Sequence, residues 1–189
     1  FVVLFSFQSS ALSVPLKEKY LPGETIIAHV EGEVLTPITP SQIEVKRGHV
    51  LTPVEYDVQQ LGREVFLWMS APRMPGNYTL ILKDVQARQE GVATAMRVEE
   101  NFSVEGKIVA YAVRPAVIAP QKDFELMIEV YTDAPQRISV SHPQQYEVVL
   151  VPGVNVLAFP LKSFRTAEVS FLTIGMYRIA VYVQGSGAA

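Results

Sequence analysis

The chain has 189 residues, of which 49% are hydrophobic, and it carries a formal charge of −3 at neutral pH. That composition allows a folded core and excludes a disordered chain, and the absence of a basic stripe argues against a nucleic-acid binder. Because the chain contains no cysteine, disulfides, thiolate nucleophiles and sulfur-ligated metal sites are excluded as well. At about 100 to 150 residues per domain, the length fits one large domain or two small ones.

The N-terminal segment, residues 1–13, begins with an apolar run and ends with a small-x-small pattern at Ala11 and Ser13. The pattern is typical of the end of a secretory signal, and the run is too short to span a bilayer, which needs about 20 apolar residues. Alternation would place one set of large side chains on the same face of a strand: Phe1, Val3, Phe5 and Phe7. Three interpretations follow: an assembly strand, a signal remnant and a truncated membrane anchor.

From residue 13 onward, apolar and polar residues alternate with period two, and helical periodicity is scarce. Thirteen prolines and eleven glycines interrupt this pattern, and such spacing of strands and turns is typical of a β-sandwich. The sequence therefore predicts an all-β fold with two sets of strands. In chain order the predicted strands are 13–20, 24–33, 41–47, 52–58, 64–70, 76–85 and 91–104, then 107–114, 123–132, 136–141, 146–151, 154–161, 167–172 and 175–183.

Two landmarks recur in both sets of strands at nearly the same offset. A proline turn before a long apolar strand occurs at Pro22 and, 98 residues later, at Pro120. A Gly-x-Tyr strand start occurs at Gly76 and, 99 residues later, at Gly175. A repeat of about a hundred residues has the size of one immunoglobulin-like sandwich, so these landmarks indicate a duplicated unit.

The repeat predicts two tandem immunoglobulin-like β-sandwich domains, residues 14–105 and 106–189. Tyr78 and Tyr177 follow the two recurring glycines, so we expect them at equivalent, buried core positions. We also assign Trp68 to the core. Its strand is apolar on both faces, which indicates a central strand or one beneath an interface. A carbohydrate-stacking platform is the alternative for this tryptophan.

The segment Lys19–Ile26 contains Tyr20-Leu21-Pro22-Gly23-Glu24-Thr25, which resembles the strand opening of macroglobulin-type immunoglobulin-like domains of surface proteins. The resemblance covers one turn and one strand. The second repeat lacks the Gly-Glu pair, and a chain without cysteine cannot carry the macroglobulin thioester. The resemblance implies a sandwich in a surface protein and says nothing about chemistry.

No arrangement typical of catalysis or of metal binding is found in the sequence. The histidines His29, His49 and His142 are each isolated, and the acidic pairs Glu31/Glu33 and Glu99/Glu100 lack the spacing of a calcium loop. Nucleophile-elbow, P-loop and dinucleotide motifs are absent. We therefore expect no enzyme activity, no catalytic or metal-ligating residues and no cofactor.

Two triplets, Asn77-Tyr78-Thr79 and Asn101-Phe102-Ser103, match the acceptor pattern for N-glycosylation. Together with the signal-like N-terminus they favour a secreted or cell-surface glycoprotein. Asn77 and Asn101 are therefore candidate glycosylation sites, although such triplets also occur by chance.

The repeat also suggests how the protein assembles. In the second set, the Gly-x-Tyr strand is the last one, so the second domain is expected to lack one strand, whereas residues 1–7 supply a spare strand at the other end. Donation of that strand to a neighbouring molecule predicts a subunit of a surface filament or pilus, with self-association or other surface proteins as partners. The alternatives are a stalk or adhesion module of a larger surface protein and a carbohydrate- or ligand-binding accessory module.

Overall fold

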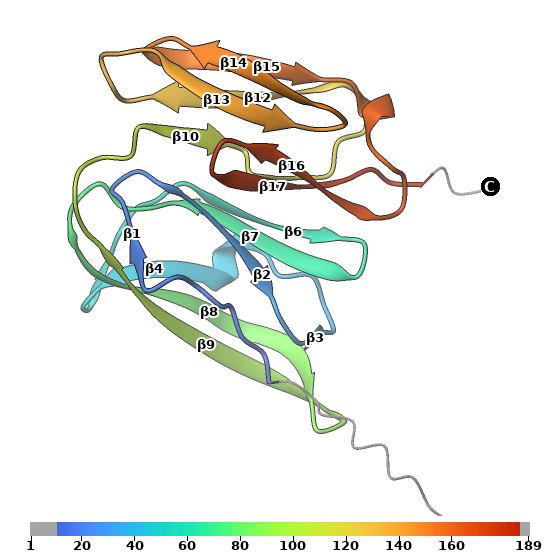
Figure 1. Cartoon of the computed structure of the whole chain (residues 1–189). Coiled ribbons are helices and arrows are strands. Elements are labelled where there is room, and N and C mark those ends of the chain that lie inside the picture. The colour runs from blue at the N-terminus through green and yellow to red at the C-terminus, as the bar shows by residue number, and fades with distance from the viewer. Residues whose placement is uncertain (1–10, 186–189) are drawn as a thin grey trace, which may run out of the picture.

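The computed structural model describes residues 11–185, and almost all of its regular structure is β-strand (Figure 1). The predicted all-β sandwich fold is confirmed. The strand predicted at residues 1–7 lies outside the described residues. The described part of the chain contains no helix with the length and hydrophobicity that crossing a bilayer requires.

We call strands β1 to β9 the first unit. Their bounds are β1 (Lys19–Tyr20), β2 (Thr25–Val30), β3 (Glu33–Val34), β4 (Ile43–Arg47), β5 (Val50–Leu51), β6 (Tyr56–Leu61), β7 (Glu64–Ser70), β8 (Gly76–Gln89) and β9 (Val92–Val104), with a 3-10 turn at Pro40–Gln42. One sheet has the order β1-β9-β8-β4-β5, with β3 also on β8, and the other has the order β2-β7-β6. Strand β1 runs parallel to β9, and the other pairs are antiparallel.

The second unit comprises β10 to β17. Their bounds are β10 (Tyr111–Arg114), β11 (Val117–Ile118), β12 (Phe124–Val130), β13 (Gln136–Ser141), β14 (Gln145–Leu150), β15 (Gly153–Phe159), β16 (Val169–Ile174) and β17 (Tyr177–Tyr182), with a 3-10 turn at Leu161–Ser163. One sheet has the order β11-β17-β16-β13-β14, and the other has the order β10-β12-β15. As in the first unit, the strand of the larger sheet that comes first in the chain, β11, runs parallel to the strand that comes last in the chain, β17.

Each unit buries the facing sides of its two sheets, as the alternation in sequence predicts. In the first unit, Leu67 and Met69 from β7 meet Leu80 and Leu82 from β8 in one core. In the second unit, the β12 and β16 strands contribute in the same way through residues such as Ile128 and Leu172. All strand pairs recorded for β1 to β9 lie within residues 19–104, and those for β10 to β17 within residues 111–182. The exact domain limits, 14–105 and 106–189, stay a prediction.

The expected equivalence of Tyr78 and Tyr177 is wrong. Tyr78 lies in β8, whereas Tyr177 lies in β17. Within the described strands, each unit has one parallel strand pair, β1 with β9 in the first unit and β11 with β17 in the second. The counterpart of β17 is therefore β9 and not β8. A Gly-x-Tyr start needs only a turn before a strand, so it arises at different strands. The proline landmark holds, because Pro22 and Pro120 precede the corresponding strands β2 and β12.

The expected loss of the last strand from the second unit is also wrong, for the same reason. Its final strand β17 is the closing strand, paired with β11 on one side and β16 on the other. Among the described residues, β6, which pairs with β7 in the first unit, has no counterpart in the second unit. The second unit has nothing in that place, so the outer edge of β15 pairs with no strand of residues 11–185.

Candidate functional site at the junction of the two units

The junction between the units is built by the two faces of β7. Its residues Val65, Leu67 and Met69 point into the core of the first unit. The alternate residues Phe66 and Trp68 point the other way and belong, with Leu61 of β6, to the hydrophobic core of the second unit. The apolar run on both faces of this strand therefore has a simple cause, because the strand lies between two cores.

Trp68 is only 4% exposed, so its ring packs at the junction and cannot serve as an open carbohydrate-stacking platform. Its indole Nε1 is buried and has no hydrogen-bond partner among the described residues. An unpaired buried donor costs free energy. The packing of the large ring against the second unit has to outweigh that cost. Trp68 therefore serves contact between the units.

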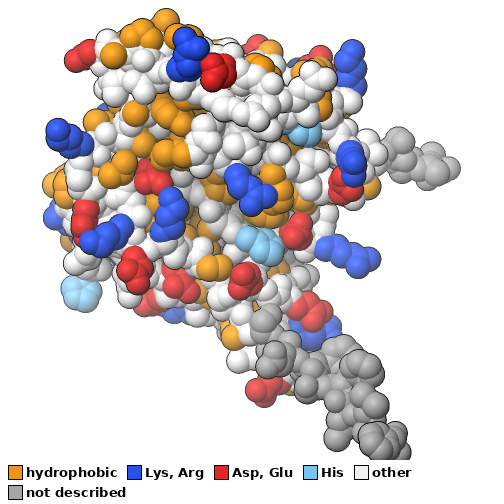
Figure 2. Space-filling view, in the orientation of Figure 1, with side chains coloured by type: hydrophobic (Ala, Val, Ile, Leu, Met, Phe, Trp, Pro, Cys, Tyr) orange, Lys and Arg blue, Asp and Glu red, His pale blue; other side chains and the backbone are white. Residues whose placement is uncertain are grey.

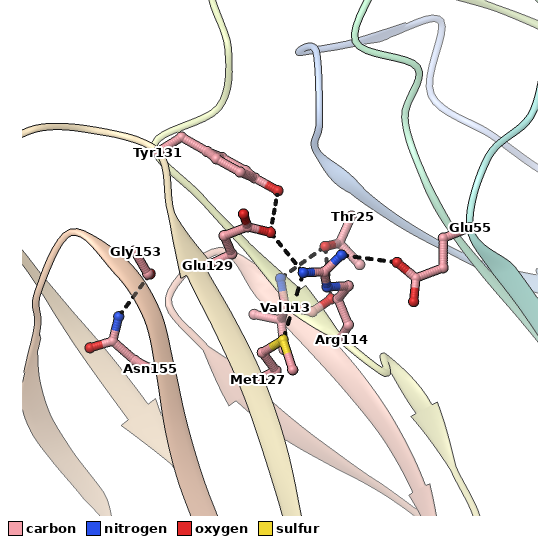
Figure 3. Close-up of polar contacts among 9 residues, drawn as sticks. All are labelled: Thr25, Glu55, Val113, Arg114, Met127, Glu129, Tyr131, Gly153 and Asn155. Carbon is pink, nitrogen blue, oxygen red and sulfur yellow. Dashed lines mark hydrogen bonds and ion pairs between the residues drawn. The ribbon is translucent and has the colours of Figure 1, made fainter.

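Thr25, the first residue of β2, forms a reciprocal pair with the second unit (Figure 3). Its Oγ1 donates to the carbonyl oxygen of Val113 over 2.9 Å and accepts from the amide nitrogen of Val113 over 3.0 Å. Both groups are buried, and a backbone donor and acceptor of β10 would otherwise lack partners. The hydroxyl thus fixes the position of β10 relative to β2.

Tyr177 adds a second buried link. Its hydroxyl donates to the carbonyl oxygen of Tyr111 over 2.8 Å and accepts from the amide of Thr25 over 3.4 Å. Burial is the main cause that raises the pKa of the Tyr177 phenol well above its ordinary range. The phenol is therefore held neutral, as a donor to the backbone that also touches the first unit.

A polar network closes one side of the junction, and Figure 3 shows Glu55 and Glu129 pointing toward Arg114 from two sides. The guanidinium lies 3.0 Å from a carboxylate oxygen of Glu55 in the first unit and 2.7 Å from one of Glu129 in the second. Burial alone would lower the pKa of Arg114, but Glu55 and Glu129 raise it overall. Tyr131 donates to Glu129 over 3.1 Å, and Arg73 lies over the Tyr131 ring.

A groove of about 460 Å³ follows the opposite side of the junction. Aromatic contacts cross it from His29 to Phe66 and from Phe66 to Phe171, with ring centroids 4.9 and 6.2 Å apart. The guanidinium of Arg178 lies 4.3 Å from the centre of the Phe171 ring. Figure 2 shows a histidine and basic side chains with hydrophobic ones between them on this face. The stacked rings and the guanidinium suit packing between the units.

The three histidines lie in different surroundings. The imidazole of His29 is 3.8 Å from Glu64, His142 stacks on Phe164 with its Nε2 2.7 Å from the carbonyl oxygen of Ser163, and His49 lies in the exposed turn between β4 and β5. Within residues 11–185, no three His, Asp or Glu side chains gather as a metal site.

Both predicted glycosylation residues are exposed on the β8–β9 pair, where Asn77 is opposite Ser103 and Thr79 is opposite Asn101. The Thr79 hydroxyl donates to the Asn101 side-chain oxygen over 2.7 Å. The two triplets thus form one patch on one face of the sheet. Modification at Asn77 and Asn101 stays a prediction.

The residues that link the units were only partly predictable. The two apolar faces of β7 indicated an interface, whereas Thr25 and Arg114 gave no such signal, because their partners are far away in the sequence. The Pro-Gly-Glu turn did carry a local signal. Gly23 has φ +76, which favours glycine, and the Glu24 carboxylate accepts from the amide of Leu21 over 2.8 Å.

Comparisons with known proteins give similarity in shape only. No family model and no curated protein sequence matches the chain. Dimeric latent PorU from Porphyromonas gingivalis is similar over 97% of this chain, with 10% identity and a TM-score of 0.45, and this chain spans 21% of the PorU chain. A DUF4785 family protein from Legionella pneumophila matches 82% of this chain and 47% of its own, with 15% identity and a TM-score of 0.29. The ectodomain of mouse nectin-like molecule 4 matches 94% and 65%, with 13% identity and a TM-score of 0.26.

Proposed function

We propose that this chain is a non-enzymatic structural or adhesion module of a secreted or cell-surface protein, in which the two units act as one rigid body. The observation that carries the proposal is the reciprocal bonding of Thr25 with Val113, next to the buried rings of Phe66 and Trp68. Units joined by a wet, polar contact are expected to move relative to each other. A shared apolar core with buried backbone bonds restrains such motion.

A rigid pair of sandwiches suits a stalk or spacer. Its outer ends keep a fixed separation and angle, so whatever lies beyond them is presented in a defined direction. The groups at the junction support this role better than catalysis, because the polar atoms of Thr25, Tyr177 and Arg114 are bonded to partners within the chain. The proposal therefore needs no cofactor and no soluble substrate.

The place of action can be tested on native cells. We expect protease added to intact cells to digest the protein, and intact mass with N-terminal sequencing to locate the mature start and any glycans at Asn77 and Asn101. Recovery of the unglycosylated, uncleaved chain in the cytoplasm alone would contradict an exported module.

A filament or pilus subunit assembled by strand donation is the second candidate. The open outer edge of β15 favours it, because an unpaired edge can accept a strand from another molecule. The donor would be the segment with Phe1, Val3, Phe5 and Phe7. In this account, deletion of residues 1–9 leaves a folded protein that no longer forms fibres in electron micrographs, and unchanged fibres would reject strand donation.

A further inference from the structure

The outer edge of β15 lacks the strand pairing that the corresponding edge of β7 has in the first unit. Strand β7 has β2 on one side and β6 on the other. Strand β15 has only β12, and the link from β14 to β15 consists of Val151 and Pro152, too short for a further strand. Edge strands of this kind present unpaired amide and carbonyl groups to solvent.

This edge lacks the features that usually prevent association. The seven residues of β15, Gly153–Phe159, include no charge and no proline. Four valines along β14, the link and β15 are each more than half exposed: Val149, Val151, Val154 and Val156. On the outer face, Val156 lies opposite Met127, which is exposed as well. A long, uncharged edge flanked by exposed apolar side chains marks an interaction surface.

We propose that β15 pairs antiparallel with β15 of a second copy of this chain, forming a two-fold dimer with a continuous six-stranded sheet. Strand β15 lies at the end of the molecule that is remote from the first unit, so a second copy can approach it (Figure 1). Since the strand is uncharged, its own copy meets it without like charges in opposition. A two-fold contact needs such a self-complementary surface.

The symmetric register follows from the length of the strand. With seven residues, an axis at the central residue pairs Val156 with Val156 of the second copy, and Val154 with Ala158. The exposed valines of the two copies then cover each other on the outer face. The inference rests on the proposed structural function and adds a second copy of the chain as partner. If no dimer forms, the proposal of a rigid junction is unaffected, because β15 takes no part in the hydrogen bonds between Thr25 and Val113.

Sedimentation velocity over a concentration series of the full chain tests the proposal. The unsubstituted protein should dimerise with rising concentration. V156K and V156E should each bind to themselves at least ~10-fold more weakly, because like charges meet at the axis. An equimolar mixture of V156K and V156E should restore a dimer. The matched control V92K changes a valine that is 64% exposed in the β8–β9 hairpin and should dimerise like the unsubstituted chain.

Four results would overturn the proposal: an unsubstituted chain that stays monomeric, a V156K variant that dimerises normally, a mixture that forms no dimer, and a V92K variant weakened as much as V156K. Deletion of residues 1–10 adds a decisive arm. If that deletion abolishes association, the occupant of the edge is the N-terminal segment and not a second β15. Circular dichroism on every variant verifies that the sheets are intact.

Discussion

Strands β7 and β15 correspond because each pairs antiparallel with the strand that follows the proline turn, β2 or β12, and they differ in how much of them is covered. Strand β7 is paired on both edges, and both of its faces are buried, one in each core. Strand β15 has one open edge and two outward valines that are more than half exposed. Corresponding strands therefore have different roles: β7 joins the two units, whereas β15 forms part of the outer surface of the second unit.

The comparison is tested most severely at Trp68. Trp68→Ala should lower the free energy of unfolding by about 3 to 5 kcal/mol, because the large ring fills the space between the units. Urea unfolding followed by far-UV circular dichroism measures this loss. Val50→Ala, at a side chain that is 69% exposed, is the control and should change stability by less than about 0.5 kcal/mol. A similar small change for Trp68→Ala would remove the joint role of β7.

Thr25→Val should cost about 1 to 3 kcal/mol, since the shape is kept while the buried amide and carbonyl of Val113 lose their partner. Thr25→Ser keeps the hydroxyl and should recover most of that loss in the same urea titration. Equal losses for the valine and serine variants would show that packing, and not the reciprocal bonding, holds β2 to β10.

Alkaline pH should weaken the junction. Burial raises the pKa of Tyr177 above its ordinary value of 10.0, so the folded state favours the neutral phenol. That preference is fully present below a pH of about 10, and it is lost as the pH rises beyond this point because the unfolded phenol ionises first. The melting temperature should fall less steeply above pH 10 in Tyr177→Phe than in the unsubstituted chain. Identical slopes would contradict this account.

The smallest effect is expected at the rim. Glu55→Gln removes one charge beside Arg114, but the Glu55 side chain is 54% exposed and Arg114 keeps Glu129. The loss should be below about 1 kcal/mol and should shrink with added salt. Thermal unfolding at low and high ionic strength measures it, and a loss that equals that of Thr25→Val would place the main restraint at the surface.

The sequence predicted the fold class because successive side chains of a strand point to opposite faces of the sheet, so that the alternation of apolar and polar residues corresponds directly to buried and exposed positions. The Pro22 and Pro120 turns were placed correctly before β2 and β12, since such turns depend on neighbouring residues. Strand equivalence could not be read in this way. The strands of Tyr78 and Tyr177 have different partners, and a local Gly-x-Tyr motif carries no information on pairing.

The junction shows the same division. The apolar pattern of β7 indicated an interface, whereas the bond from Thr25 to Val113 joins residues 88 positions apart. A threonine at the start of a strand carries no sequence signal for a partner so far away in the chain. The open edge of β15 was not predicted, because the sequence indicated the loss of the closing strand, whereas the strand without a counterpart in the second unit is β6.

Rigid coupling of the two units is tested most directly by pulsed electron spin resonance. The chain has no cysteine, so Val50→Cys in β5 and Arg137→Cys in β13 give two unique labelling positions at exposed sites. Labelled protein diluted with unlabelled protein should show one narrow distance distribution, and Thr25→Val should broaden it. A broad or two-peaked distribution in the otherwise unsubstituted chain would contradict a rigid junction.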